Sequence, residues 1–210
     1  MPHPQEIFQR CDQLDSLPRL FRDNYEWELS VLERELPPGA SVLQVGSMDG
    51  LRLIRLSMRR PDLRLTGLDI DAELIELARA HAGGAGIGIQ FILGDITAPP
   101  PLERFDYAMC LNNTLGYIPE DGLAVARMRQ VAGSVLVSVY GERTTDGLAG
   151  EYFGVLGTAV TGVRHLGDCD LIIVEGLGEV RRYHAERLET WTTEKQDTPL
   201  GYWARIAGTP

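Results

Sequence analysis

The sequence predicts an α/β protein built on a mostly parallel sheet. Apolar strand-like runs alternate with helix-like segments along most of the chain, an order typical of parallel strands joined by helical crossovers. The run over residues 41–50, SVLQVGSMDG, reads as a buried strand that stops at a glycine before a helix begins. Polar residues also follow the ends of later strands. In open α/β sheets, ligands bind at these carboxyl ends.

Helices and strands follow one another in a definite order. Two helices, over residues 4–14 and 22–36, precede the glycine motif, and the second is halted by Pro37 and Pro38. After the motif we predict a partly buried helix 49–60, strand 64–69, helix 72–82, strand 87–93, strand 105–111, helix 119–132, strand 134–140 and a helix within 148–160. The tail changes character: a strand 171–174, a polar stretch 183–191 compatible with a helix, and a closing strand 201–207. With no repeat or linker visible, we predict one domain over residues 1–210, in which residues 1–38 form a helical cap and residues 39–210 the core.

Composition narrows the classes of function. The 210 residues can bury one good core, and a formal net charge of −10 disfavours a nucleic-acid partner. The start of the chain has no signal-peptide pattern, and no apolar run approaches the roughly 18 residues of a membrane span. We therefore predict a soluble, cytoplasmic protein without a membrane partner and leave its oligomeric state open. Its three cysteines are widely spaced and lack a metal-ligand pattern, so no metal is predicted.

Polar residues stand just past three successive strand ends. Asp69 ends the strand that lies roughly 20 residues beyond the glycine turn, where a carboxylate accepts hydrogen bonds from ribose in nucleotide-binding folds. Asp95 follows the next strand, and Asn112 and Asn113 follow the one after it. Each has a simpler explanation: a helix cap, for which Asp71 is the better candidate, or an anchor for a turn. Three such positions after a glycine turn make a joint binding site the preferred interpretation.

The four runs VLQVGSMDG, LTGLDID, FILGDI and FDYAMCLNNTLGYI resemble the successive motifs of class I S-adenosylmethionine-dependent methyltransferases. This resemblance implies a Rossmann-like sheet of seven strands with helices on both faces and an antiparallel C-terminal hairpin. It implies S-adenosyl-L-methionine as cofactor, with the glycines near its methionine part, Asp69 near its ribose, and Asp95 near its adenine. The implied cofactor residues are Tyr25, Gly46, Ser47, Gly50, Asp69, Ile70, Asp95, Ile96, Leu111 and Asn112.

Two positions depart from the family pattern. Met48 stands where a third glycine is usual, and its side chain would either crowd the methionine part or require a positive φ. Gln44 replaces an acid that often precedes the glycines, and it retains hydrogen-bonding capacity without the charge.

The predicted function is methyl transfer to a nitrogen or oxygen of a small molecule. The predicted catalytic residues are Asn112, Tyr117 and Tyr140, while Glu142 and His184 are weaker candidates for which surface or packing roles are preferred. One alternative is a non-catalytic or cofactor-binding module that keeps the fold. Another is an NAD(P)-dependent oxidoreductase, which the absence of a GxGxxG pattern disfavours.

Overall fold

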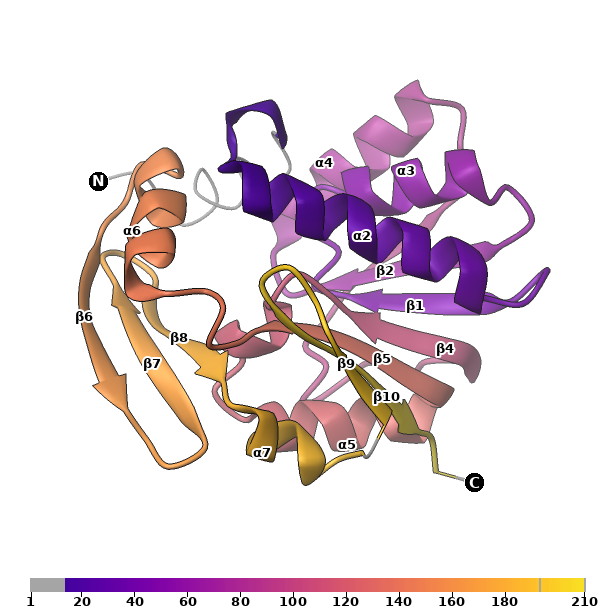
Figure 1. The fold of residues 1–210 in the computed structure, drawn as a ribbon. Coiled ribbons are helices and arrows are strands. Elements are labelled where there is room, and N and C mark those ends of the chain that lie inside the picture. Colours follow the sequence, from indigo (N-terminus) through magenta and orange to yellow (C-terminus); the bar gives the residue numbers. More distant parts are fainter. Residues whose placement is uncertain (1–13, 193, 210) are drawn as a thin grey trace.

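A seven-stranded sheet, sheet A, forms the centre of the protein (Figure 1). The computed structural model describes residues 14–192 and 194–209. The strand order is β3-β2-β1-β4-β5-β10-β9; neighbours from β3 to β5 are parallel, whereas β10 is antiparallel to both β5 and β9. The strands are β1 (Ser41–Val45), β2 (Arg64–Asp69), β3 (Gln90–Leu93), β4 (Phe105–Cys110), β5 (Ala132–Tyr140), β9 (Glu194–Asp197) and β10 (Gly201–Ala207). The predicted mostly parallel sheet with an antiparallel C-terminal pair is confirmed.

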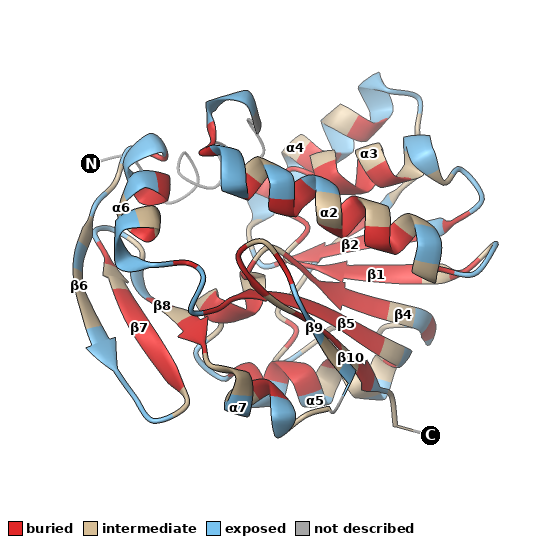
Figure 2. Ribbon diagram, in the orientation of Figure 1, coloured by how far each residue is buried: buried red, intermediate tan, exposed pale blue. Residues whose placement is uncertain are grey.

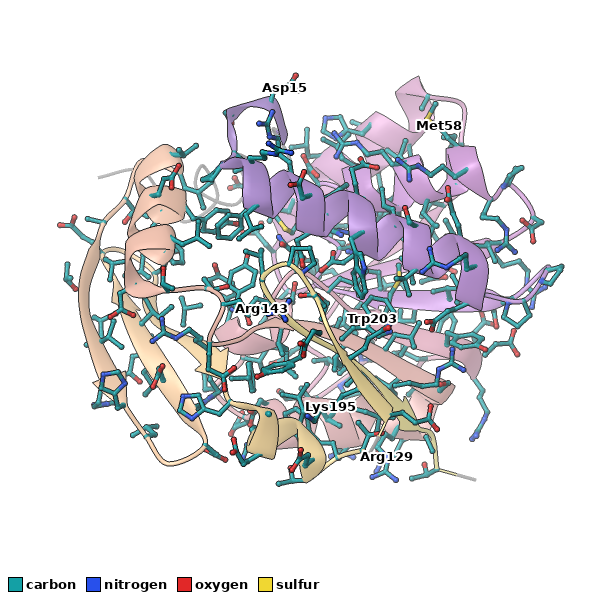
Figure 3. The ribbon with its side chains drawn as sticks, viewed as in Figure 1. Asp15, Met58, Arg129, Arg143, Lys195 and Trp203 are labelled. Carbon is teal, nitrogen blue, oxygen red and sulfur yellow. The ribbon has the colours of Figure 1, made fainter. Side chains whose placement is uncertain are left out.

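Helices cover both faces of sheet A (Figure 1). The helices α2 (Arg19–Glu35), α3 (Leu51–Arg59) and α4 (Ala72–Gly84) lie on one face, and α5 (Asp121–Val131) lies on the other. Successive residues of β1 show why: Val42 packs into the core cluster beneath α2 to α4, and Leu43 into the cluster beside α5. The strands between these layers are largely buried (Figure 2). By contrast, Met58, labelled in Figure 3, is 72% exposed on α3, which confirms that this helix is only partly buried.

A second, antiparallel sheet, sheet B, follows β5 in the chain. It contains β6 (Val160–His165), β7 (Cys169–Val174) and β8 (Gly178–Tyr183), and α6 (Asp146–Val155) precedes it. Figure 1 shows α6 and sheet B beside one end of sheet A. Buried Ile172 and Val180 pack with Tyr152 and Phe153 of α6, so one apolar cluster holds this unit together.

Several predicted boundaries were wrong or incomplete. The helix within residues 148–160 stops at Val155, and the sequence missed β6 and β8 altogether. These two strands carry few apolar residues, and the register of β6 shifts between Val160 and Gly162. Strand β3 begins at Gln90 instead of residue 87, and the polar stretch 183–191 contains the short helix α7 (Ala185–Glu189).

Other predictions about organisation are not tested. The predicted helix 4–14 lies outside the described residues except for its last position, which begins the 3-10 helix η1 (Leu14–Ser16). The single domain, with a cap ending at residue 38, stays a prediction. Within residues 14–192 and 194–209, no helix combines the length and the apolar character that crossing a membrane requires.

Candidate active site

A cavity of about 360 Å³ lies at the carboxyl ends of the sheet A strands. Its walls come from the ends of β1 and β2, the segment after β3, the turn after β4, and α6. This is the edge at which open α/β sheets bind ligands. Seven of the predicted site residues line the cavity: Gly46, Asp69, Ile70, Asp95, Ile96, Asn112 and Tyr117.

The turn after β1 has three residues with positive φ. Gly46 has a φ of +69°, and a Cβ on it would lie 2.3 Å from Cγ2 of Thr114, so only glycine permits this close approach of two cavity walls. Met48 has a φ of +51°, which is the strained conformation expected at this position. Its side chain lines the cavity. Gly50, with a φ of +78°, completes the turn at the start of α3.

Asp69 connects this turn to the end of β2. Its Oδ2 accepts from the backbone N–H of Met48 at 2.8 Å, and its Oδ1 accepts from the N–H of Asp71 at 3.0 Å. Burial raises the pKa of this carboxyl group, with backbone hydrogen bonds opposing the shift. An ionised carboxylate has about four acceptor sites, so Asp69 can still accept from a ligand beside its backbone donors. The cap of α4 is Asp71, which accepts from the N–H groups of Glu73 and Leu74, so the simpler explanation does not apply to Asp69.

Asp95 combines an anchoring role with a place in the cavity wall. Its Oδ1 accepts from the N–H of Thr97 at 2.8 Å, as an anchor of the turn would. Nearby, Ile96 is 3% exposed and Ile70 is 70% exposed, and both line the cavity. One carboxylate with two apolar side chains suits a flat aromatic ligand that carries exocyclic hydrogen-bond donors.

The turn after β4 contains two consecutive asparagines in the left-handed region. Asn112 and Asn113 have φ values of +51° and +61°, a conformation that asparagine tolerates better than most residues. Asn113 is fully buried: its Oδ1 accepts from the N–H of Tyr140 at 3.0 Å, and its Nδ2 donates to the carbonyl of Arg181 at 3.1 Å. Asn112 lines the cavity. Its Oδ1 accepts from the hydroxyl of Tyr140 at 3.2 Å.

Five predicted site residues lie outside the cavity wall. Tyr140 is 2% exposed and contacts the cavity wall through Asn112, to which its hydroxyl donates, and through the ring of Tyr152. A Cβ on Gly50 would meet Phe91 and Ala78 within the core. The other three are Tyr25, Leu111 and Ser47. The ring of Tyr25 lies under the guanidinium of Arg52. Leu111 packs in the α2 to α4 cluster, and the side chain of Ser47 adjoins Gly67.

The weaker candidates have other contacts. Glu142 accepts a hydrogen bond from the hydroxyl of Tyr202, and Nε2 of His184 lies 3.3 Å from Asp170. Neither lines the cavity, so the packing and surface roles preferred for them fit the structure.

Sequence reasoning missed two features of the site. Tyr152 of α6 lines the cavity, and nothing in its sequence context indicated this. Glu28 is fully buried and forms an ion pair with Arg52 close to the turn after β4. A signal for Glu28 existed, because it stands next to Leu29 and three positions after Tyr25, on the apolar face of its helix.

Acidic side chains supply all the formal charge in the cavity wall. The lining contains Asp69, Asp71, Asp95 and Glu120, and no arginine, lysine or histidine of the described residues joins them. Such a wall attracts a cationic ligand and disfavours one that carries phosphate groups. These features suit S-adenosylmethionine. The negative charge suits its sulfonium, the apolar side chains Ile70 and Ile96 suit its adenine, and the carboxylate acceptors suit its ribose hydroxyls.

The sheet order, with its antiparallel C-terminal pair, matches the Rossmann-like fold of solved methyltransferase structures. Residues 42–133 match the family model described as a methyltransferase domain, which confirms the predicted resemblance over this segment. Among solved structures, the PH0226 protein from Pyrococcus horikoshii is similar over 93% of this chain and 94% of its own, with a TM-score of 0.68 and 17% identity. CalS10 from Micromonospora echinaspora, an amino pentose methyltransferase with S-adenosylmethionine bound, covers 88% of this chain and 90% of its own, with a TM-score of 0.62 and 17% identity.

Curated relatives match a shorter part of the chain. Carboxy-S-adenosyl-L-methionine synthase from Campylobacter jejuni subsp. doylei is 28% identical over 99 residues, which are 47% of this chain and 40% of that protein. The match therefore spans less than half the length of that relative. Together these similarities support the predictions of an enzyme and of S-adenosylmethionine as its cofactor.

Proposed function

We propose that the protein transfers the methyl group of S-adenosylmethionine to a nitrogen or oxygen atom of a small molecule. The observation that carries this proposal is the acid-lined, partly apolar cavity beside the turn after β4. In it, Asp69 would accept from the ribose hydroxyls, and Asp95, with Ile70 and Ile96 in the same wall, would hold the adenine. Gly46 and Thr114, neighbours in the cavity wall, would lie beside the methionine part.

When bound, S-adenosylmethionine would supply an electrophilic methyl group on a positively charged sulfur; an electron pair of the acceptor would bond to the methyl carbon as the carbon–sulfur bond breaks, and neutral S-adenosylhomocysteine would leave. The protein contributes mainly orientation and exclusion of water. Met48, Tyr117 and Tyr152 form the part of the wall that adjoins the apolar cluster of α6 and sheet B. Asn112, held by Tyr140, presents a polar side chain in the wall, where it orients the acceptor.

Charge in the cavity wall narrows the class of acceptor. An acceptor carrying a carboxylate or phosphate would face four carboxylates with no cation in the described lining to pair it. A neutral amine or a hydroxyl avoids this repulsion. The same repulsion disfavours formation of carboxy-S-adenosylmethionine, the product in the name of the Campylobacter relative, because that product bears an additional carboxylate.

The two alternatives make different predictions for binding. An NAD(P)-dependent oxidoreductase would need to hold a pyrophosphate in this acidic cavity, so the charges disfavour it. A non-catalytic module would bind S-adenosylmethionine without turning it over.

Calorimetric titration with S-adenosylmethionine, S-adenosylhomocysteine and NADH tests the cofactor. We expect binding of the first two and none of NADH; binding of NADH alone would contradict the proposal. A panel of uncharged amines, hydroxyl compounds and matched carboxylates, followed by mass spectrometry of S-adenosylhomocysteine and methylated product, then tests catalysis. Methylation confined to carboxylates would contradict the proposed acceptor class, and binding without turnover across the panel would favour the non-catalytic alternative.

A further inference from the structure

Glu28 of α2 has a fully buried carboxylate that accepts four hydrogen bonds. Its Oε1 accepts from the hydroxyl of Ser138 at 2.5 Å, from Nδ2 of Asn24 at 3.0 Å and from the backbone N–H of Asn112 at 3.2 Å. Its Oε2 accepts from Nη1 of Arg52. This single side chain therefore connects α2 and α3 with β5 and the turn after β4.

Arg52 supplies the opposite charge. It lies in α3, two residues after Gly50, and its side chain is 5% exposed. Its guanidinium carbon lies 3.9 Å from the centre of the Tyr25 ring, so this ring covers one face of the guanidinium. A buried ion pair can often be replaced by apolar residues without loss of stability. Stability alone therefore does not require a carboxylate at this position.

The backbone of the turn after β4, by contrast, needs a hydrogen-bond acceptor at the position of Glu28. Asn113 is held by its own side chain and by its N–H, which donates to the carbonyl of Ser138 at 2.9 Å. The N–H of the preceding residue, Asn112, donates to Glu28. Asn112 has a positive φ, which asparagine tolerates but which is uncommon in a residue other than glycine, and this hydrogen bond restrains its backbone there.

We propose that Glu28 is a positioning residue, whose carboxylate holds the backbone of Asn112 so that its side chain lies in the cavity wall. The inference rests on the proposed function insofar as Asn112 orients the acceptor. The hydrogen bond itself can be tested without knowing the acceptor.

A double variant separates this role from a structural one. Glu28→Met alone removes the carboxylate that pairs with the buried Arg52 and should unfold at a clearly lower temperature. Glu28→Met with Arg52→Met replaces both charges by apolar side chains and should recover most of that loss. It still provides no acceptor for the N–H of Asn112. Glu35→Gln is the matched control. Glu35 lies at the far end of the same helix, and its carboxylate pairs with Arg205 of β10.

The readout is amide hydrogen exchange of the whole protein, measured by mass spectrometry of its peptides. The segment of interest is residues 110–117. We expect exchange in this segment to be about tenfold faster or more in the double variant, because a hydrogen bond to a charged acceptor is lost, and unchanged in Glu35→Gln. Other segments of sheet A should keep the parent's exchange rates. Parent-like exchange at residues 110–117 in a stable double variant would overturn the proposal, as would an increase spread evenly over the chain. Titration of the parent with S-adenosylhomocysteine tests the cofactor separately, so the two proposals can fail independently.

Discussion

The backbone N–H of Met48 donates to Oδ2 of Asp69 at 2.8 Å, so a carboxylate at the end of β2 holds the turn that follows β1. The two strands are parallel neighbours, with Val45 beside Leu68, and this hydrogen bond extends their pairing beyond the last strand residues. Asp69 thereby fixes a strained turn and faces the cavity at the same time. The wall is organised before any ligand arrives, which reduces the entropy lost on binding.

Asp69→Ala should weaken binding of S-adenosylhomocysteine at least tenfold, since hydrogen bonds from the ribose to a carboxylate contribute roughly 1.5–3 kcal/mol each. Calorimetric titration measures the change. Asp106→Ala is the control, because Asp106 also holds β1, through the N–H and hydroxyl of Ser41, but does not line the cavity. If Asp69→Ala bound as tightly as the parent, the placement of the ribose would be wrong.

Met48→Gly should leave cofactor binding unchanged or improve it, because it opens the cavity wall and removes a residue from the left-handed region. Met48→Ala also removes the side chain but keeps a Cβ at positive φ. We therefore expect the glycine variant to have the higher free energy of unfolding, by up to about 1 kcal/mol. Urea denaturation of the two variants measures their free energies of unfolding. An alanine variant of equal or greater stability would show that the turn is not strained at Met48.

Asn112→Gly should lower turnover at least tenfold while changing the affinity for S-adenosylhomocysteine little, in line with one misplaced polar contact at the reacting groups. Glycine keeps the positive φ of this position accessible, so the variant removes the side chain without adding strain. Initial rates with an acceptor identified from the panel, together with calorimetry, separate the two effects. Tyr140→Phe, which removes only the hydroxyl donor to Asn112, should have a smaller effect in the same direction. Normal rates in Asn112→Gly would remove this residue from the mechanism.

Much of sheet A was predictable because parallel strands buried on both faces appear as continuous apolar runs, as in β1 and β5. Sheet B was not. Its outer strand β6 is half exposed and interrupted by Gly162, and β8 contains Arg181 and Arg182, whose partners lie on other segments. No local pattern distinguishes such strands from loops, since pairing across the sheet and distant charges determine them.

The site could be predicted where spacing reflects sheet geometry. Asp69 and Asp95 follow strand ends, and parallel strands bring those ends together at one edge. The family resemblance was the only basis for predicting Tyr25, Ser47 and Leu111 as site residues. In the structure these three lie outside the cavity wall. Tyr152 could not be predicted, because it reaches the cavity through the packing of α6 against sheet B and Phe21, a contact between distant segments.

Asp170 of β7 should make the stability of the protein depend on pH under acidic conditions. Burial raises its pKa, but hydrogen bonds from His165 and Arg182 and the charge of Arg182 outweigh burial and lower the pKa from 3.8 to about 2. Because the pKa in the folded state lies below the unfolded value, the ionised group stabilises the fold above pH 3.8. That contribution, on the order of 2 kcal/mol, is lost as the pH falls toward 2.

Urea denaturation at pH 5 and pH 3 tests this dependence with the variant Asp170→Asn, which keeps the shape of the side chain but cannot ionise. We expect the parent to be more stable than the variant at pH 5, and the difference to fall by about half at pH 3. Glu179→Gln is the control in the same sheet: its carboxylate is exposed and pairs with exposed Arg164, so its effect should stay within about 0.5 kcal/mol at both pH values. A difference between the parent and Asp170→Asn that is equal at pH 5 and pH 3 would mean that the ion pair with Arg182 does not shift the titration of Asp170. The cluster around Asp170 would then hold sheet B together through hydrogen-bond geometry alone.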